Sequence, residues 1–296
     1  TMSEDVDLNV IARGSPGFSG ADLEALINEA AILAAGQGKM AVEMGDLEEA
    51  RDKVRFGRQK KNRVMSEQDR LTTAYHEAGH ALVASLHPDV EPLHKVTIIP
   101  RGLSLGMTMI LPEKDRYGVR KRECLGMLTM HMAGRVAEEK FCDDISSGAK
   151  DDIDNATKLA RQMVTQWGMS QQLGPVSYSE EQNHVFLGSE ISRSSKHGEH
   201  IAEQIDKEIQ SILEEAYTNA EEMLEEKSAE VENLARALLK LETLDVDEVN
   251  EILDGKTADE LIDEKGVPEE STEETEEDLP DEPAAGDLPA PAGSPA

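Results

Sequence analysis

The chain has 296 residues, enough for one large or two modest domains, and 38% are hydrophobic while only 3% are aromatic. A packed core must therefore be built mainly from aliphatic side chains. The net charge of −31 argues against a nucleic-acid partner, because a phosphate backbone repels such a surface. Two cysteines exclude a disulfide framework and fit a reducing cytosolic setting. No apolar run approaches the roughly 20 residues that span a bilayer.

Residues 1–63 form the first predicted unit, a set of short helices followed by a basic linker, GRQKKNRV. The segment GFSGADLEALINEAAILAAGQG predicts a helix that begins after Ser19, because Asp22 nearly completes a capping box. Its apolar positions recur at helical spacing and predict one buried face, made of Leu23, Leu26, Ile27, Ala30, Ala31 and Ala34.

Residues 64–253 form the second predicted unit, which is largely helical with a small β-sheet. A helix of about 20 residues is expected from Ser66, its cap, to Pro88, and HKVTIIPRG and GMTMILP are predicted strands. Residues 254–296 carry fifteen acidic and two basic residues and have almost nothing to bury, so we predict a disordered acidic tail. The opening TMSEDVDL lacks the character of a domain start, and we expect it to be a cut.

The stretch TTAYHEAGHAL, residues 72–82, holds two histidines four residues apart. On a helix, His76 and His80 lie one turn apart on the same face and can share one metal ion. Zinc accepts such nitrogen ligands, and Glu77 is placed to take a proton from a water that the metal acidifies. A chance histidine pair on a surface helix is the plain alternative. Gly79 and the surrounding alanines indicate a buried helix, which favours zinc-dependent hydrolysis.

A third ligand is required, and spacing alone leaves several candidates open. Acidic residues near the start of a helix also have a plain explanation, because they suit the helix dipole. Another histidine, His131, is predicted to line the core or a substrate groove, because its neighbours are methionines. The candidate third ligands are Glu138, Glu139, Asp143, Asp144, Asp151, Asp152 and Asp154.

Several motifs occur in one order along the chain: AYHEAGHAL, HKVTIIPRG, GRVAEE, SSGAKDDIDNATKLARQMVTQWGMS and LGPVSY. Together they closely resemble the peptidase domain of FtsH-type membrane-bound AAA zinc metalloproteases, from about residue 66 to about residue 250. GFSGADLEALINEAAILAA resembles the helical AAA lid of the same family. The resemblance implies that His76, His80 and Asp152 bind Zn²⁺ and that Glu77 is the catalytic base. It departs from the family at Ala133, where the family often has glycine.

The resemblance also implies a fold and a setting. The fold is a helical AAA lid (1–63), a zincin-type peptidase domain (64–253) and the acidic tail (254–296). The family is ATP-dependent, so ATP and Mg²⁺ are expected to act only through its AAA core, which these motifs do not include. The family's N-terminal transmembrane helices are not among these motifs either. Such proteases degrade unfolded or misassembled membrane and cytosolic polypeptides as homo-hexamers on the cytoplasmic side of the bacterial inner membrane. Peptide is expected to add to a strand edge beside the zinc, at KVTIIP or MTMILP. A catalytically inactive oligomeric scaffold of the same fold is the alternative function.

Overall fold

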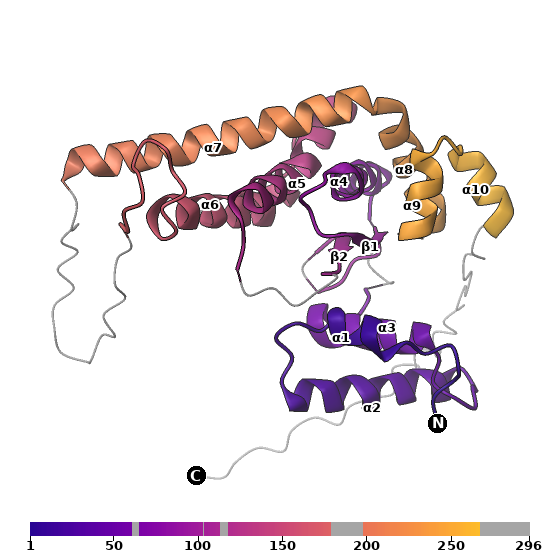
Figure 1. The fold of residues 1–296 in the computed structure, drawn as a ribbon. Coiled ribbons are helices and arrows are strands. Elements are labelled where there is room, and N and C mark those ends of the chain that lie inside the picture. The colour runs from indigo at the N-terminus through magenta and orange to yellow at the C-terminus, as the bar shows by residue number, and fades with distance from the viewer. Residues whose placement is uncertain (61–64, 103, 113–117, 179–197, 267–296) are drawn as a thin grey trace, which may run out of the picture.

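The computed structural model of the chain describes residues 1–60, 65–102, 104–112, 118–178 and 198–266 (Figure 1). It confirms the expected fold class, a mostly helical chain with one small β-sheet. Across these ranges, no helix combines the length and the apolar character that a membrane span requires.

Three helices near the N-terminus form a unit with its own core: α1 (Leu8–Arg13), α2 (Gly20–Gly36) and α3 (Met44–Phe56). The predicted capping box of α2 is present, because Ser19 Oγ accepts a hydrogen bond from the Asp22 amide while the Asp22 carboxylate accepts one from the Ser19 amide. The buried side chains of this unit are Ile11, Leu26, Ala30, Leu47 and Ala50.

The predicted apolar face of α2 is only partly buried. Leu26, Ala30 and Ala34 face the core, whereas Leu23 and Ile27 are each 44% exposed. The three-helix unit is too small to cover the whole face, so the helical spacing correctly predicted the core side but overestimated its width.

The larger unit is built around α4 (Glu67–Leu86), which packs against α5, α8 and the sheet, while the long α7 runs across α5 and α6 (Figure 1). Its other elements are β1 (Leu93–Thr97), β2 (Met107–Ile110), α5 (Lys121–Phe141), the 3₁₀ helix η1 (Ser147–Ala149), α6 (Lys150–Thr165), α7 (Glu199–Glu226), α8 (Ser228–Leu241), β3 (Thr243–Asp245), α9 (Val246–Leu253) and α10 (Ala258–Lys265).

Small side chains let α4 lie at the centre of this unit. Ser66 caps the helix as predicted, accepting a hydrogen bond from the Asp69 amide. Ala74, Ala78 and Ala81 are fully buried, so neighbouring helices approach the α4 backbone closely. The histidine pair therefore lies on a buried helix, as the alanine-rich sequence indicates.

The sheet has the strand order β2-β1-β3, and both pairings are antiparallel. Val96 of β1 lies opposite Thr108 of β2 on one side and Leu244 of β3 on the other. The predicted strands HKVTIIPRG and GMTMILP thus pair with each other. β1 is the central strand, so β2 and β3 form the edges of the sheet in the part that the structure describes.

The predicted tail begins too early. Residues 258–265, assigned from the sequence to a disordered tail, form α10, which packs against α8. Thr257 caps the helix through a capping box with Glu260, and Ala258 and Leu261 are buried. The net acidity of the segment obscured this short amphipathic pattern. The rest of the predicted tail, residues 267–296, lies outside the described residues.

Ion pairs join α3 to the sheet. Asp52 of α3 is buried and accepts hydrogen bonds from Arg51 and from Lys95 of β1, while Arg101 pairs with Glu49. The three-helix unit is therefore attached to β1, the central strand of the sheet. The predicted boundary between the two units, at residue 63, stays a prediction.

Candidate metal centre

The side chains of His76 and His80, both on α4, bring their Nε2 atoms close together. The Nε2 atoms of His76 and His80 are 3.0 Å apart, and both side chains are buried. This follows from their spacing, because side chains four residues apart on a helix are neighbours. The rings meet nearly at right angles, with centroids 4.6 Å apart.

A carboxylate from a distant helix completes the cluster. Asp152 lies in the first turn of α6, and its Oδ2 is 3.3 Å from His76 Nε2 and 3.5 Å from His80 Nε2. One ligand atom from each of these three residues lies within 4.8 Å of the others, so the three side chains can hold one metal ion. Two imidazole nitrogens and one carboxylate oxygen form a donor set that suits zinc and leaves room for a further ligand.

The other candidate third ligands lie elsewhere. Glu138 contacts the opposite nitrogen of the His76 ring, Nδ1, and Glu139 contacts the hydroxyl of Tyr217. The side chain of Asp151 is 90% exposed, and Asp154 forms an ion pair with Lys150. Asp143 and Asp144, in the turn after α5, are also exposed.

The Nδ1 atoms of both histidines contact groups of α5. His80 Nδ1 lies 2.7 Å from the carbonyl oxygen of Met130. Because a carbonyl oxygen only accepts, Nδ1 must carry the proton, and the lone pair of Nε2 is left for a metal. Glu138 Oε1 lies 2.7 Å from His76 Nδ1 and plays the same part there. Glu138 is itself fixed by the backbone N–H and the hydroxyl of Ser146.

A glycine of α5 makes room for the cluster. A β-carbon at Gly134 would lie 2.5 Å from His80 Nε2 and 2.6 Å from His76 Cε1. Gly79 of α4 plays the matching part, since a β-carbon there would lie 2.6 Å from the carbonyl oxygen of Ala133. Ala133, where the sequence departs from the resembled family, thus contributes backbone to this crossing, and its side chain is fully buried.

Glu77 lies between the histidines in sequence and faces β2. Thr108 Oγ1 donates a hydrogen bond of 2.6 Å to Glu77 Oε2, and a β-carbon at Gly106 would lie 2.6 Å from Glu77 Oε1. Burial raises the pKa of Glu77, although the neighbouring His76 and His80 side chains and the hydrogen bond from the Thr108 hydroxyl oppose this shift. A carboxylate with a raised pKa is a better proton acceptor at neutral pH than an exposed one.

Two family models match the chain. The model of "Peptidase family M41" matches residues 63–252, and that of "AAA+ lid domain" matches residues 5–49. The chain belongs to peptidase family M41. It is 53% identical over 252 residues to "ATP-dependent zinc metalloprotease FtsH 2" of Methylacidiphilum infernorum, which covers 85% of this chain and 39% of that protein.

Two further relatives extend the match along the M41 chain. "ATP-dependent zinc metalloprotease FtsH 1" of Thermoanaerobacter sp. is 47% identical over 255 residues, covering 86% of this chain and 42% of the relative. "ATP-dependent zinc metalloprotease FtsH" of Acidobacterium capsulatum is 42% identical over 297 residues, covering 100% of this chain and 46% of the relative. The chain therefore spans less than half the length of these relatives.

The charges of the M41 site depend on one another. Burial opposes protonation of His76, but hydrogen bonds with Asp152 and Glu138 and the nearby Glu77 charge outweigh it and raise the pKa of His76 to about 10. Burial likewise disfavours the charge of Asp152, yet hydrogen bonds from His131, His76 and His80 hold its pKa far below the usual range. These contacts favour a protonated His76 opposite an ionised Asp152.

His131 and Thr108 both contact side chains of the site, although the sequence does not mark either as a site residue. The sequence predicts that His131 packs in the core or lines a groove, but its Nδ1 lies 3.3 Å from Asp152 Oδ1. The methionines around it favour packing as the explanation. The contact arises where α5 crosses α6, 21 residues further along the chain, so no local pattern could have predicted it.

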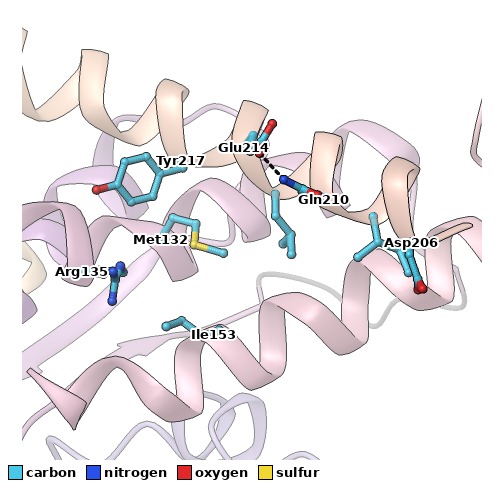
Figure 2. A pocket seen from close by; sticks show the side chains of 9 residues that line it. Met132, Arg135, Ile153, Asp206, Gln210, Glu214 and Tyr217 are labelled. Atoms are coloured by element: carbon cyan, nitrogen blue, oxygen red, sulfur yellow. Dashed lines mark hydrogen bonds between the residues drawn. The ribbon is translucent and has the colours of Figure 1, made fainter. Parts of the chain in front are cut away.

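An apolar groove of about 390 Å³ lies between α5, α6 and α7 (Figure 2). Two of its lining residues, Met132 and Ile153, directly follow His131 and Asp152 in the chain, and Tyr217 and Gln210 of α7 line it as well. The groove therefore adjoins α6, which carries Asp152, and α5, which carries His131.

Proposed function

We propose that this chain is the lid and zinc endopeptidase part of an ATP-dependent protease. The proposal rests mainly on the cluster of His76, His80 and Asp152, which brings three ligand atoms within 4.8 Å of one another. Glu77 directly follows His76 in the sequence. The names of the M41 relatives, all zinc metalloproteases, support zinc as the metal.

In the proposed mechanism the protein supplies positioning and proton transfer. His76, His80 and Asp152 would hold a zinc ion, which when bound would supply an acidified water and polarisation of the carbonyl of the bond to be cut. Glu77 accepts the proton of the attacking water and then donates it to the leaving amine. Thr108 keeps the Glu77 carboxylate in place, and burial of the site strengthens these electrostatic interactions.

The substrate is proposed to bind along β2. Of the two expected segments, β1 already pairs on both sides, whereas β2 is an edge of the described sheet. Thr108 of β2 contacts Glu77, so a peptide added to this edge would pass beside the catalytic base. Backbone pairing of this kind is indifferent to most side chains, which suits a protease that cuts many polypeptides.

The wider setting is proposed from the resemblance and the relatives. The substrates are unfolded or misassembled membrane and cytosolic proteins, and ATP with Mg²⁺ acts through an AAA core. The assembly is a homo-hexamer on the cytoplasmic side of the bacterial inner membrane. The attachment of α3 to β1 through Asp52 and Lys95 supports a mechanical link between the lid and the peptidase unit.

The experiment compares the native chain with Glu77→Gln, using unfolded casein as substrate and the zinc content as a second readout. We expect both proteins to bind one zinc ion and only the native chain to cleave. Glu139→Gln is the matched control, because Glu139 contacts Tyr217 outside the cluster. Stoichiometric zinc without cleavage, even after an ATP-hydrolysing core is joined to the chain, would favour the inactive scaffold.

A further inference from the structure

The two oxygens of the Asp152 carboxylate have different partners. Oδ2 faces the two ring nitrogens of α4, at 3.3 Å from His76 Nε2 and 3.5 Å from His80 Nε2. Oδ1 faces His131 Nδ1 at 3.3 Å. One oxygen is thus directed at the metal position, and the other is held by a side chain of α5.

His131 does not belong to the metal cluster itself. Among the described residues, the group of side chains whose ligand atoms lie within 4.8 Å of one another contains His76, His80 and Asp152. Any effect of His131 on the metal must therefore pass through Asp152. The basic partners of Asp152 in the described part of the chain are all histidines, because Lys150 instead pairs with Asp151 and Asp154.

We propose that His131 is a positioning residue for the metal site, which donates a hydrogen bond from Nδ1 to Asp152 Oδ1 and thereby directs Oδ2 at the zinc. This inference rests on the proposed function, because it concerns the same zinc ion. It adds a residue that the motifs of the family did not mark as functional.

The physical reason is the freedom of a carboxylate at a helix start. Asp152 lies in the first turn of α6 with its side chain 23% exposed, so without a partner it can rotate or turn its second oxygen to water. A hydrogen bond to Oδ1 removes this freedom before the metal binds. His131 can provide it because its own side chain is only 17% exposed and is therefore held by its surroundings.

The contact between His131 Nδ1 and Asp152 Oδ1 also favours metal coordination by one oxygen of the Asp152 carboxylate, Oδ2, instead of by both. If both oxygens approached the metal, Oδ1 would have to leave His131 Nδ1. Holding Oδ1 away keeps one coordination position open, which a catalytic zinc needs for water and substrate. His131 would therefore influence both the affinity for zinc and the geometry of its ligands.

Two substitutions separate positioning from packing. His131→Leu fills similar space but removes the donor. His131→Asn keeps one, because the Asn amide nitrogen, like Nδ1, is bonded to the γ-carbon. His87→Leu is the matched control, since His87 lies at the end of α4 and contacts the Asp89 amide instead of the cluster.

The test measures zinc affinity of the metal-free chain by competition with a chromophoric chelator. We expect His131→Leu to weaken zinc binding by about 10-fold or more, as for other groups that orient metal ligands, and His131→Asn to recover most of that loss. His87→Leu should bind zinc like the native chain. X-ray absorption at the zinc edge should show a changed carboxylate coordination in His131→Leu.

Thermal unfolding of the metal-free variants shows whether each variant is folded, so that weak zinc binding is not caused by loss of the fold. The inference is overturned if His131→Leu binds zinc as tightly as the native chain, or if a folded His131→Asn binds as weakly as His131→Leu. The proposed function fails separately, and takes this inference with it, if the native chain binds no zinc or if His76→Ala leaves its zinc affinity unchanged.

Discussion

Glu138 Oε1 lies 2.7 Å from His76 Nδ1, on the ring nitrogen that does not face Asp152. Glu138 is buried and is fixed in turn by Ser146, whose amide and hydroxyl both contact its carboxylate. Hydrogen bonds from His76 and Ser146 outweigh the effect of burial and lower the pKa of Glu138, so it stays ionised. This carboxylate, a candidate third ligand by sequence, therefore holds the His76 ring from the side that does not face Asp152.

Glu138→Gln should weaken zinc binding by about 10-fold to 100-fold, because a neutral amide orients and polarises the His76 ring less than a carboxylate does. The measurement is chelator competition on the metal-free variant. Glu139→Gln, one residue further along α5, is the control and should leave the affinity unchanged. Equal affinities for Glu138→Gln and the native chain would show that this hydrogen bond does not matter for the metal.

Gly134→Ala should abolish the site while leaving the fold in place. The added methyl group would lie 2.5 Å from His80 Nε2, so the histidine rings must move apart. We expect zinc affinity to fall by roughly 100-fold and stability to fall by about 1–3 kcal/mol through overpacking. Zinc titration and thermal unfolding check both effects. Gly45→Ala in α3 is the control, because a β-carbon there meets open space; a Gly134→Ala protein with native zinc affinity would refute the close crossing of α4 and α5.

Thr108→Val should lower kcat by about 10-fold while the affinity for zinc stays native. The substitution keeps the shape of the side chain but removes the hydroxyl that donates to Glu77 Oε2, and a buried carboxylate that loses one partner is held less well. Thr108→Ser should restore most of kcat, which a purely structural effect on β2 would not. Peptide-cleavage kinetics measure this, and a Thr108→Val enzyme with native kcat would count against the role of Thr108.

Zinc binding should release a proton from His76. The pKa of this residue is raised to about 10 in the metal-free chain, so His76 is charged at neutral pH and must lose its proton to bind the metal. Zinc affinity should therefore rise with pH, by about 10-fold per unit over the range in which one proton is displaced. Calorimetry in buffers of different ionisation enthalpy should count about one proton near pH 7.5, whereas no release would contradict a protonated His76 in the metal-free site.

The raised pKa of His76 also makes the folding stability of the metal-free chain depend on pH. The folded pKa of His76 lies above its usual value of 6.5, so its charged contacts stabilise the fold fully below about pH 6.5 and are lost as the pH rises through about 10. Urea unfolding of the metal-free chain should therefore show falling stability across this interval. His76→Asn should flatten the decline, and an identical pH profile for that variant would locate the effect elsewhere.

The sequence predicted the helix of the site better than its outlying partners. His76, His80 and Glu77 share one helix, so their mutual placement follows from the helical repeat. Asp152 lies 76 residues beyond His76, and only the packing of α6 brings it to the cluster, so spacing left it among several acidic candidates and the resemblance alone singled it out. The contacts of Glu138 and His131 arise from the same long-range packing.

The C-terminal end shows the opposite case, in which a local signal was present but outweighed by composition. The sequence TADELI combines a capping box at Thr257 and Glu260 with apolar residues at Ala258 and Leu261, a pattern typical of a short helix. The acidic and proline-rich residues that follow suggested a tail without structure from residue 254 onwards. Burial of Leu261 against α8 stabilises a helix that its net charge does not favour.

Anomalous diffraction at the zinc absorption edge, from crystals of the zinc-loaded chain, would show which residues bind the metal. We expect one strong peak at about 2.0–2.2 Å from His76 Nε2, His80 Nε2 and a carboxylate oxygen of Asp152, with Glu138 remaining on His76 Nδ1. A peak bonded to Glu138 or to surface carboxylates, or no peak between the two histidines, would contradict the proposed zinc site.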